Sequence, residues 1–270
     1  MGVAVVTGAS TGIGKATAQR LARDPGVELV LVARREELLR KLAESLPCPA
    51  TWVAVDLTAE DAPQRVRAHL EAEHGGDLHL LVNNAGAAWR GSFAETGYAN
   101  VHRHMELNFD AVVRLTEALL PLLRKSAPSA IVNVASTAGR VSRARTGAYS
   151  ASKFALIGWS DSLYAEEGAH GVHVGLVLPG FVRTEGFPAT ELREKAATRW
   201  IVSKPETVAE AIHRCGPGRK AERYVPRPYA LAAALRILAP SLVRRVLSGG
   251  AAENLTTSTG NDRDRGSKPG

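Results

Sequence analysis

Residues 3–14 read VAVVTGASTGIG. The apolar run from Val3 to Val6 predicts a short buried strand, and a helical pattern begins at Gly12. Glycine permits a tight turn between two such elements. A helix N-terminus presents free N–H groups and the positive end of the helix dipole, so the turn is suited to hold an anionic pyrophosphate. A plain glycine turn is the simpler alternative.

The alternation of apolar runs and helical patterns continues along the chain. Further strands are predicted over Glu28–Ala33, Thr51–Val55, Leu78–Asn83, Ala130–Val134, His173–Leu178 and Arg223–Val225. Helices are predicted over Gly12–Arg23, Glu36–Leu46, Asp61–His74, Tyr98–Leu123, Ala148–Glu167 and Pro205–Arg214. Apolar strands that alternate with helices are typical of a parallel sheet covered on both faces. We therefore expect an α/β fold.

The composition is that of an ordinary globular protein. Of the 270 residues, 45% are hydrophobic and 23% are charged, which excludes a disordered chain, a collagen-like repeat and a coiled-coil rod. Two cysteines, Cys48 and Cys215, are too few for a disulfide scaffold and suit a reducing cytosol. No apolar run approaches the roughly 20 residues that span a bilayer, and no basic segment typical of a signal peptide precedes Val3. We expect a cytoplasmic protein.

The basic charge is concentrated in one segment. The net charge is +7, and the whole excess lies between Arg214 and Arg245, where eight basic side chains accompany a single acid, Glu222. Such a patch attracts anionic lipid, an acidic protein or nucleic acid. The rest of the domain has balanced charge, so we expect no nucleic-acid partner.

The end of this segment has an amphipathic pattern. Over residues 229–247, one side of a predicted helix carries Leu231, Leu235, Leu238, Leu242 and Val246, and Pro240 interrupts the helix. This kinked helix could pack on its own domain or on another subunit, or it could contact an anionic membrane from one side. From Gly249 on, small polar residues predict a disordered tail. We thus divide the chain into a single domain (1–227), a basic amphipathic helix (228–248) and a tail (249–270).

Two arginines, Arg34 and Arg35, follow the second predicted strand about twenty residues after Gly14. An acid at this place would bind the ribose of NAD, whereas arginine accommodates the 2′-phosphate of NADP. Because a guanidinium matches phosphate oxygens, the pair favours NADPH over NADH. In the alternative, the arginines only begin a solvated helix, and this alternative applies more to Arg35.

Tyr149 and Lys153 are four residues apart on a helical pattern, and therefore share one face. A tyrosine with a pKa of about 10 is a poor proton donor at neutral pH, but a neighbouring ammonium stabilises its phenolate. The pair would form a tuned acid/base. Ser136, at the end of the strand before this helix, could hold a carbonyl oxygen in the same cleft. Without such neighbours, the pair would be a surface pair and the serine a turn residue.

From Val3 to about Val225 the chain resembles the classical short-chain dehydrogenase/reductase family. The motifs that carry the resemblance are TGASTGIG at 7–14, Asp56-Leu57, Asn83–Gly86, Asn108, Ser136, Tyr149–Lys153, and Pro179-Gly180 followed by Thr184. The resemblance implies one Rossmann-like domain whose doubly wound, parallel, seven-stranded sheet has the order 3-2-1-4-5-6-7, with helices on both faces. It also implies a homodimer or homotetramer built on the helices after strands 4 and 5.

The resemblance assigns roles to individual residues. Tyr149 would donate a proton to a carbonyl, or accept one in alcohol oxidation, and Ser136 would polarise the substrate oxygen. Lys153 would lower the pKa of Tyr149 and bind the nicotinamide ribose, Asn108 would hold a proton-relaying water, and Asp56 would bind the adenine. The cofactor-binding positions would be Gly8, Ser10, Thr11, Gly12, Ile13, Gly14, Arg34, Arg35, Asp56, Leu57, Asn84, Ala85, Gly86, Tyr149, Lys153, Pro179, Gly180, Val182 and Thr184.

We therefore expect an oxidoreductase that transfers a hydride between NADP(H) and a carbonyl or secondary alcohol. The segments that wall the family's substrate pocket carry Trp89, Arg90, Val141, Arg143, Arg145, Phe181, Phe187, Leu192 and Trp200. Their aromatic character predicts an apolar or bulky substrate, and Arg143 and Arg145 could bind an acidic group on it.

Two other functions remain open. One is an NADP-binding sensor or scaffold that acts through its basic C-terminal region, and the other is a reductase of lipid-like or carrier-bound 3-oxoacyl chains. No metal site is expected, because the eight histidines show no metal-binding spacing and fit surface positions.

Overall fold

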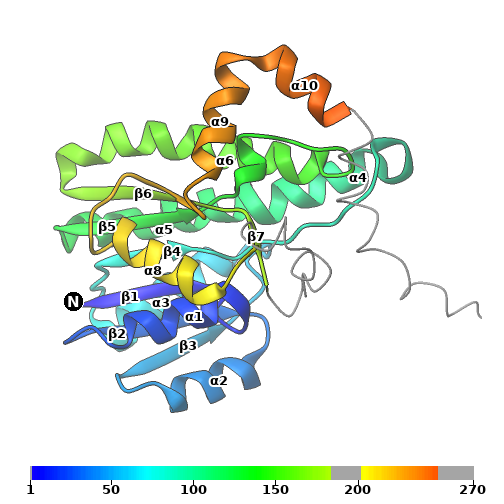
Figure 1. Ribbon diagram of the computed structural model, residues 1–270. Coiled ribbons are helices and arrows are strands. Elements are labelled where there is room, and N and C mark those ends of the chain that lie inside the picture. The colour runs from blue at the N-terminus through cyan, green and yellow to red at the C-terminus, as the bar shows by residue number, and fades with distance from the viewer. Residues whose placement is uncertain (1, 184–201, 249–270) are drawn as a thin grey trace, which may run out of the picture.

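The computed structural model describes residues 2–183 and 202–248. A seven-stranded parallel sheet lies between two layers of helices (Figure 1). Its strands, in spatial order, are β3 (Ala50–Ala54), β2 (Glu28–Ala33), β1 (Val3–Thr7), β4 (Leu80–Asn83), β5 (Ser129–Val134), β6 (Val172–Pro179) and β9 (Glu222–Val225). The predicted fold class and strand order are confirmed, since β9 is the seventh strand of this sheet.

The strands are apolar because both faces of the sheet are covered. Alternate residues of one strand enter different cores: Val5 packs with α3 and α5, whereas Val6 packs with α1 and α8. The covering helices are α1 (Gly12–Leu21), α2 (Glu36–Ser45), α3 (Ala62–His74), α5 (Ala111–Lys125), α6 (Gly147–Glu167) and α8 (Pro205–Cys215). Because the seven strands are parallel, their carboxyl ends lie along one edge of the sheet, which is where ligand sites of such sheets form.

The helix predicted over Tyr98–Leu123 is divided in the structure. α4 (Phe93–Met105) begins earlier, at a capping box in which the Ser92 hydroxyl accepts the Glu95 N–H and the Glu95 carboxylate accepts the Ser92 N–H. A π-helical turn, η1 (Glu106–Asp110), then joins α4 to α5. The single apolar pattern across these elements hid both the cap and the wider turn.

Four further short elements were not predicted. The two-residue strands β7 (Phe181–Val182) and β8 (Val202–Ser203) pair in parallel, and two 3₁₀ turns are η2 (Thr137–Gly139) and η3 (Gly168–His170). Elements of two or three residues give no periodicity that a sequence pattern could reveal.

The C-terminal amphipathic segment forms two helices, α9 (Tyr229–Leu238) and α10 (Pro240–Ser248), which project from the end of the sheet (Figure 1). Pro240 ends the first helix because it lacks an N–H, and it is favourable at the first position of the second. The tail predicted over 249–270 lies outside the described residues. None of the helices described has both the length and the apolar character needed to cross a bilayer.

Candidate functional site

The glycine-rich turn between β1 and α1 has the backbone that the sequence predicts. Gly8 and Gly12 adopt left-handed φ angles of +65° and +55°, which side chains disfavour. A Cβ on Gly14 would overlap the carbonyl oxygen of Gly8, so the helix can approach the turn only with glycine at this position. The turn thus leaves the N-terminus of α1 open toward the cleft.

Thr7 ties this turn to the segment after β4. Its hydroxyl accepts the N–H groups of Asn84 and Ala85 at 2.9 and 3.0 Å and donates to the Val82 carbonyl at 3.1 Å. The Asn84 side chain returns a hydrogen bond to the Thr7 carbonyl at 2.9 Å. Two motifs that lie 77 residues apart therefore form one rigid wall.

The ends of β2 and β3 bring polar groups to the same wall. Arg35 donates to the hydroxyls of Ser10 and Thr11, both at 3.1 Å, so it is held against the glycine-rich turn. Arg34 is 76% exposed and lies 3.7 Å from the Asp56 carboxylate. Burial favours the neutral form of Asp56, but hydrogen bonds from Thr58 and the charge of Arg34 outweigh it and lower the pKa of Asp56.

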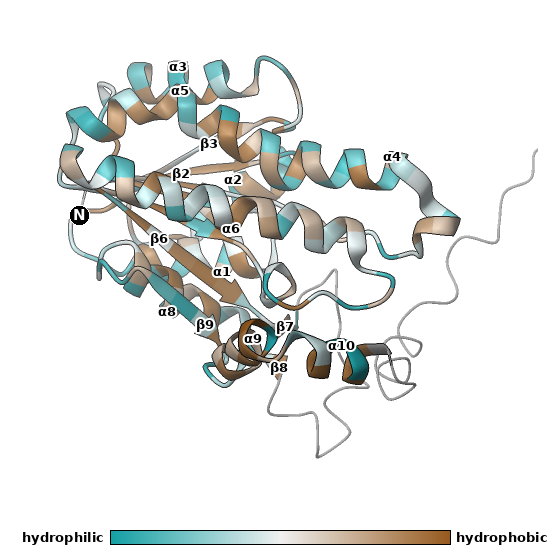
Figure 2. Ribbon diagram, turned by 90° about the horizontal axis from the view of Figure 1, so that it is seen from above, coloured by the Kyte–Doolittle hydropathy of each residue, from teal (hydrophilic) through white to brown (hydrophobic). Residues whose placement is uncertain are grey.

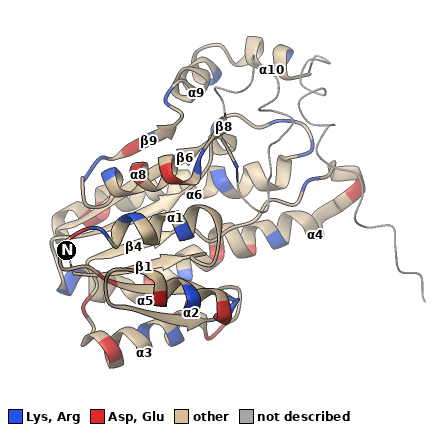
Figure 3. Ribbon diagram, turned by 60° about the horizontal axis from the view of Figure 1, so that its bottom comes forward, with Lys and Arg blue, Asp and Glu red and all other residues tan. Residues whose placement is uncertain are grey.

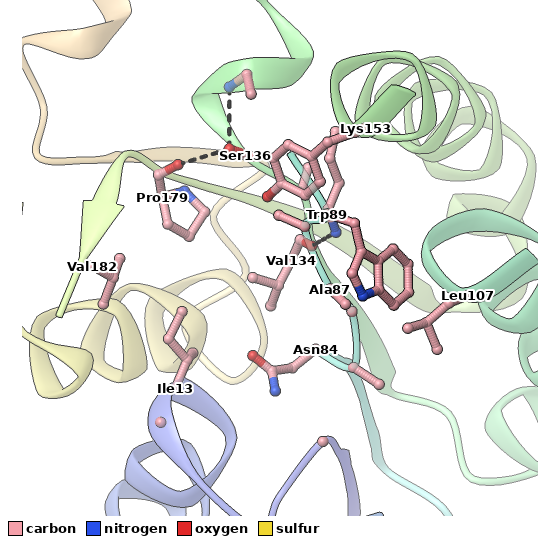
Figure 4. Close-up of a pocket in the computed structure, with 18 of the residues that line it drawn as sticks. Ile13, Asn84, Ala87, Trp89, Leu107, Val134, Ser136, Lys153, Pro179 and Val182 are labelled. Carbon is pink, nitrogen blue, oxygen red and sulfur yellow. Dashed lines mark hydrogen bonds between the residues drawn. The ribbon is translucent and has the colours of Figure 1, made fainter. Parts of the chain in front are cut away.

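Ser136 and Lys153 come from the end of β5 and from α6, and they face one cavity (Figure 4). The Ser136 hydroxyl accepts the Ala138 N–H at 3.1 Å and donates to the Pro179 carbonyl at 3.3 Å. Lys153 is 4% exposed, and its ammonium donates to the Val134 carbonyl at 3.0 Å. Both polar groups are therefore held by backbone atoms at the sheet edge.

The electrostatics of Tyr149 differ from the prediction. Burial is the largest influence and raises the pKa of Tyr149, while a hydrogen bond with Ser136 and the charges of Arg143 and Arg90 oppose it. Burial also lowers the pKa of Lys153, to about 8. A low-dielectric site disfavours both the phenolate and the ammonium. The prediction that Lys153 lowers the pKa of Tyr149 did not take this burial into account. A raised pKa favours the neutral phenol of Tyr149, which is the form that can donate a proton.

Asn108 lies in the π-helical turn and is completely buried. Its amide donates to the Ala87 carbonyl at 2.9 Å and to the Ser152 hydroxyl at 3.1 Å, and its oxygen accepts the Ala87 N–H at 2.9 Å. A Cβ on Gly86 would lie 2.8 Å from this oxygen and 3.6 Å from the Lys153 ammonium. The Asn108 side chain therefore fixes the backbone beside Lys153.

A single cavity of about 800 Å³ joins these groups. The predicted positions that line it are Gly8, Ser10, Thr11, Gly12, Ile13, Arg34, Arg35, Asp56, Leu57, Asn84, Ala85, Gly86, Ser136, Tyr149, Lys153, Pro179, Gly180 and Val182. Gly14 and Asn108 lie behind the lining, where they shape it, and Thr184 falls outside the described residues. The donor set fits a dinucleotide, because glycine backbone and arginines lie at one end and hydroxyl and ammonium groups at the other.

The substrate end of the cavity is lined by Trp89, Arg90, Val141, Arg143 and Phe181, together with Tyr224 and Tyr229, which the sequence did not single out. The Arg143 guanidinium lies 4.6 Å from the Phe181 ring centre. Phe187, Leu192 and Trp200 fall outside the described residues.

Arg145 is not part of this lining. It has a left-handed φ of +62° and forms an ion pair with Glu95 at 3.0 Å. The structure gives Arg145 a partner on α4 and no place in the described lining of the cavity.

His104 was expected at the surface, and that expectation is wrong. It is completely buried, accepts the Trp89 N–H at 3.0 Å, and makes a hydrogen bond of 2.6 Å with the Asn100 carbonyl. Its ring centre lies 4.9 Å from that of Trp89 and 6.1 Å from that of Tyr149. His104 thus positions Trp89, which lines the substrate end of the cavity, near Tyr149. The spacing of Asn100, His104 and Asn108 at intervals of four was the available signal.

No metal site was expected among the eight histidines of the sequence. In residues 2–183 and 202–248, no group of three His, Cys, Asp or Glu side chains is placed to hold a metal ion.

Comparisons with known proteins bear on this site. The sequence model of the family described as "short chain dehydrogenase" matches residues 2–195. "Dehydrogenase/reductase SDR family member 7B" of Danio rerio is 34% identical over 194 residues, which cover 67% of this chain but only 61% of the zebrafish protein. "Ketoacyl reductase HetN" of Nostoc sp. is 31% identical over 210 residues, 77% of this chain and 72% of that protein. The crystal structure of a short-chain dehydrogenase from Streptomyces avermitilis aligns with a TM-score of 0.75 and 29% identity, covering 94% of this chain and 97% of the other.

Proposed function

Because the chain belongs to the short-chain dehydrogenase/reductase family, whose members are oxidoreductases that act on CH–OH groups with NAD(P), we propose that it transfers a hydride between NADP(H) and a carbonyl or secondary alcohol. The observation that carries the proposal is the single cavity that contains both the glycine-rich turn and the three polar residues Ser136, Tyr149 and Lys153. The bound cofactor supplies or accepts the hydride.

The preference for NADP rests on the two arginines after β2. Arg34 is exposed at the cavity wall, and Arg35 is fixed there by the hydroxyls of Ser10 and Thr11. Together these four residues would hold a 2′-phosphate through charge-assisted hydrogen bonds. The turn and the N-terminus of α1 would hold the pyrophosphate.

The proton step belongs to the residues of β5 and α6. Ser136 would hold the carbonyl oxygen, and Tyr149, kept neutral by burial, would donate its proton to that oxygen as the alcohol forms. Lys153 would bind the cofactor ribose and, with a pKa of about 8, could return a proton to Tyr149 near neutral pH.

An assay of NADPH consumption over a panel of aldehydes and ketones tests this proposal against a sensor or scaffold that only binds the cofactor. We expect turnover for the wild type, and a roughly 1000-fold lower kcat for Tyr149→Phe with unchanged NADPH affinity. Equal inactivity of both proteins, with NADPH still bound, would favour the scaffold.

A narrower proposal, the reduction of 3-oxoacyl chains on a carrier, is favoured by Arg143. Burial and the neighbouring Arg90 lower the pKa of Arg143, and in the described part of the chain this guanidinium has no ion pair with an acid. A negatively charged carrier phosphate or substrate carboxylate would provide one. The name of the Nostoc relative, a ketoacyl reductase, supports the same substrate class. A comparison of acetoacetyl thioesters with neutral ketones of similar size tests it.

We also propose a homodimer or homotetramer in the cytoplasm. α6 exposes Phe154 and Tyr164, with 45% and 48% of their surfaces accessible, and these side chains would give a subunit contact its apolar surface. Both cysteines are free thiols, which a reducing compartment preserves. Light scattering coupled to size-exclusion chromatography, with Phe154→Glu as the variant, tests the assembly.

A further inference from the structure

α9 and α10 together expose an apolar surface, which we call the docking face. It consists of Leu231, Leu235, Ile237, Leu238, Leu242 and Val246. Leu231 and Leu238 are 78% and 82% exposed, whereas the inward residues Ala233 and Val243 are buried. Leu231, Leu235 and Leu238 share one side of α9 because they follow helical spacing. Figure 2 shows apolar residues along both helices at the edge of the molecule.

The docking face is surrounded by positive charge. From Arg223 to Ser248 the chain contains no Asp or Glu, but it carries Arg227, Arg236, Arg244 and Arg245 in or next to the two helices. Figure 3 shows blue and no red on α9 and α10. A surface that combines exposed leucines with arginines alone is complementary to a layer that is apolar inside and anionic at its surface.

We propose that the docking face binds the surface of an anionic phospholipid bilayer, with α9 and α10 lying in the interfacial plane. Two other occupants fit less well. A second copy of the chain placed by two-fold symmetry would bring the same arginines together, which is repulsive. Nucleic acid would satisfy the arginines but would leave the leucines in water.

The side of α9 opposite the docking face reaches the catalytic cavity. Tyr229, Ala232 and Ala233 of α9 line that cavity, and the Tyr229 ring packs so closely on Gly180 that a Cβ there would overlap it. Docking would therefore place one wall of the cavity at the bilayer. A carbonyl-bearing lipid that partitions into the membrane is the substrate class that this arrangement would serve. This last step rests on the proposed reaction, whereas membrane binding does not.

Co-sedimentation of the full-length protein with vesicles tests the docking directly. The vesicles are phosphatidylcholine alone, or phosphatidylcholine with about one-third phosphatidylglycerol. We expect strong binding to the anionic vesicles only, and weaker binding at raised salt. Arg244→Gln combined with Arg245→Gln should reduce the partition coefficient about fivefold per arginine, so roughly 25-fold for the pair. Leu231→Glu combined with Leu238→Glu should abolish binding.

Matched controls separate docking from general effects. Arg40→Gln combined with Arg67→Gln removes the same charge from α2 and α3, and Phe93→Glu changes an exposed apolar residue of α4. Both controls should bind vesicles like the wild type and, like the docking-face variants, should keep wild-type turnover of a water-soluble ketone. Wild-type protein that fails to bind anionic vesicles would overturn the proposal. A docking-face variant that binds vesicles like the wild type would also overturn it. The same holds for a docking-face variant whose only change is that the protein becomes a monomer instead of an oligomer. Wild-type protein that binds anionic vesicles but turns over no ketone would count against the proposed reaction alone.

Discussion

The two ends of the catalytic cavity are built in different ways. At the cofactor end, hydrogen bonds of 2.9 to 3.1 Å join Thr7 to Val82 and Asn84 in a wall of backbone and short side chains. At the substrate end, Trp89, Arg143 and Tyr229 come from separate segments of the chain and line the cavity. Backbone geometry constrains the first end to a few residue types, whereas the second can change its lining without changing the fold.

The difference implies that substitutions at the cofactor end affect folding and binding together, whereas substitutions at the substrate end affect only the choice of substrate. The largest effect is expected for Gly14→Ala. Its Cβ would overlap the Gly8 carbonyl, so the turn must move, and we expect loss of NADPH binding and destabilisation by about 3 kcal/mol. Thermal unfolding and fluorescence titration measure both.

Gly158→Ala is the control for this substitution, because a Cβ on Gly158 meets no atom within 4 Å. It should change the free energy of unfolding by no more than about 1 kcal/mol, in the stabilising direction. If Gly14→Ala behaved like Gly158→Ala, the cofactor end would not be constrained as described.

The next effect concerns the choice of cofactor. Arg34→Gln combined with Arg35→Gln should weaken NADPH binding roughly 100-fold and leave NADH binding nearly unchanged, because the 2′-phosphate is the only part of the nucleotide that the two guanidiniums are expected to contact. Dissociation constants for both nucleotides, measured by fluorescence, check this. Equal weakening of both would show that the arginines support the turn and not the phosphate.

A smaller effect is expected at the substrate end. Arg143→Gln should raise KM roughly tenfold for a ketone that carries a carboxylate or for a 3-oxoacyl thioester on a phosphate-bearing carrier, and leave kcat and neutral ketones unaffected. Arg145→Gln is the matched control, since Arg145 is paired with Glu95 and lies outside the cavity lining. Steady-state kinetics on both substrate classes measure the difference. An identical response of the two variants would remove Arg143 from substrate recognition.

A pH dependence of stability is expected where the two ends of the cavity meet. The pKa of Lys153 is about 8 in the folded protein and about 10.5 when unfolded, so the unfolded chain binds more protons between these values. The free energy of unfolding should therefore rise between pH 8 and 10, by up to about 3 kcal/mol relative to Lys153→Met. Urea unfolding of both proteins across this range measures it. A constant difference from pH 7 to 10 would contradict the burial of this ammonium.

The same contrast explains what could be predicted from the sequence. The α/β fold class and the glycine-rich turn followed from local patterns, because the strands, the helices and the glycines at 8, 12 and 14 are specified by residues close together in the chain. The sheet order was implied by the family resemblance, and the structure confirms it. The π-helical turn, the buried His104 and the contribution of Tyr229 depend on packing between distant segments, which periodicity does not encode. The direction of the Tyr149 pKa was missed for the same reason, since the degree of burial is a property of the folded chain.

The central claim is that the phenol of Tyr149 faces a nicotinamide in the cavity that begins at the glycine-rich turn. A crystal structure of the protein with bound NADP tests it most directly. We expect the adenosine 2′-phosphate beside Arg34 and Arg35, and the nicotinamide within contact of the Tyr149 hydroxyl, with Lys153 bonded to the ribose. A nucleotide bound elsewhere, or a Tyr149 hydroxyl that points away from it, would show that Tyr149 is not the proton donor.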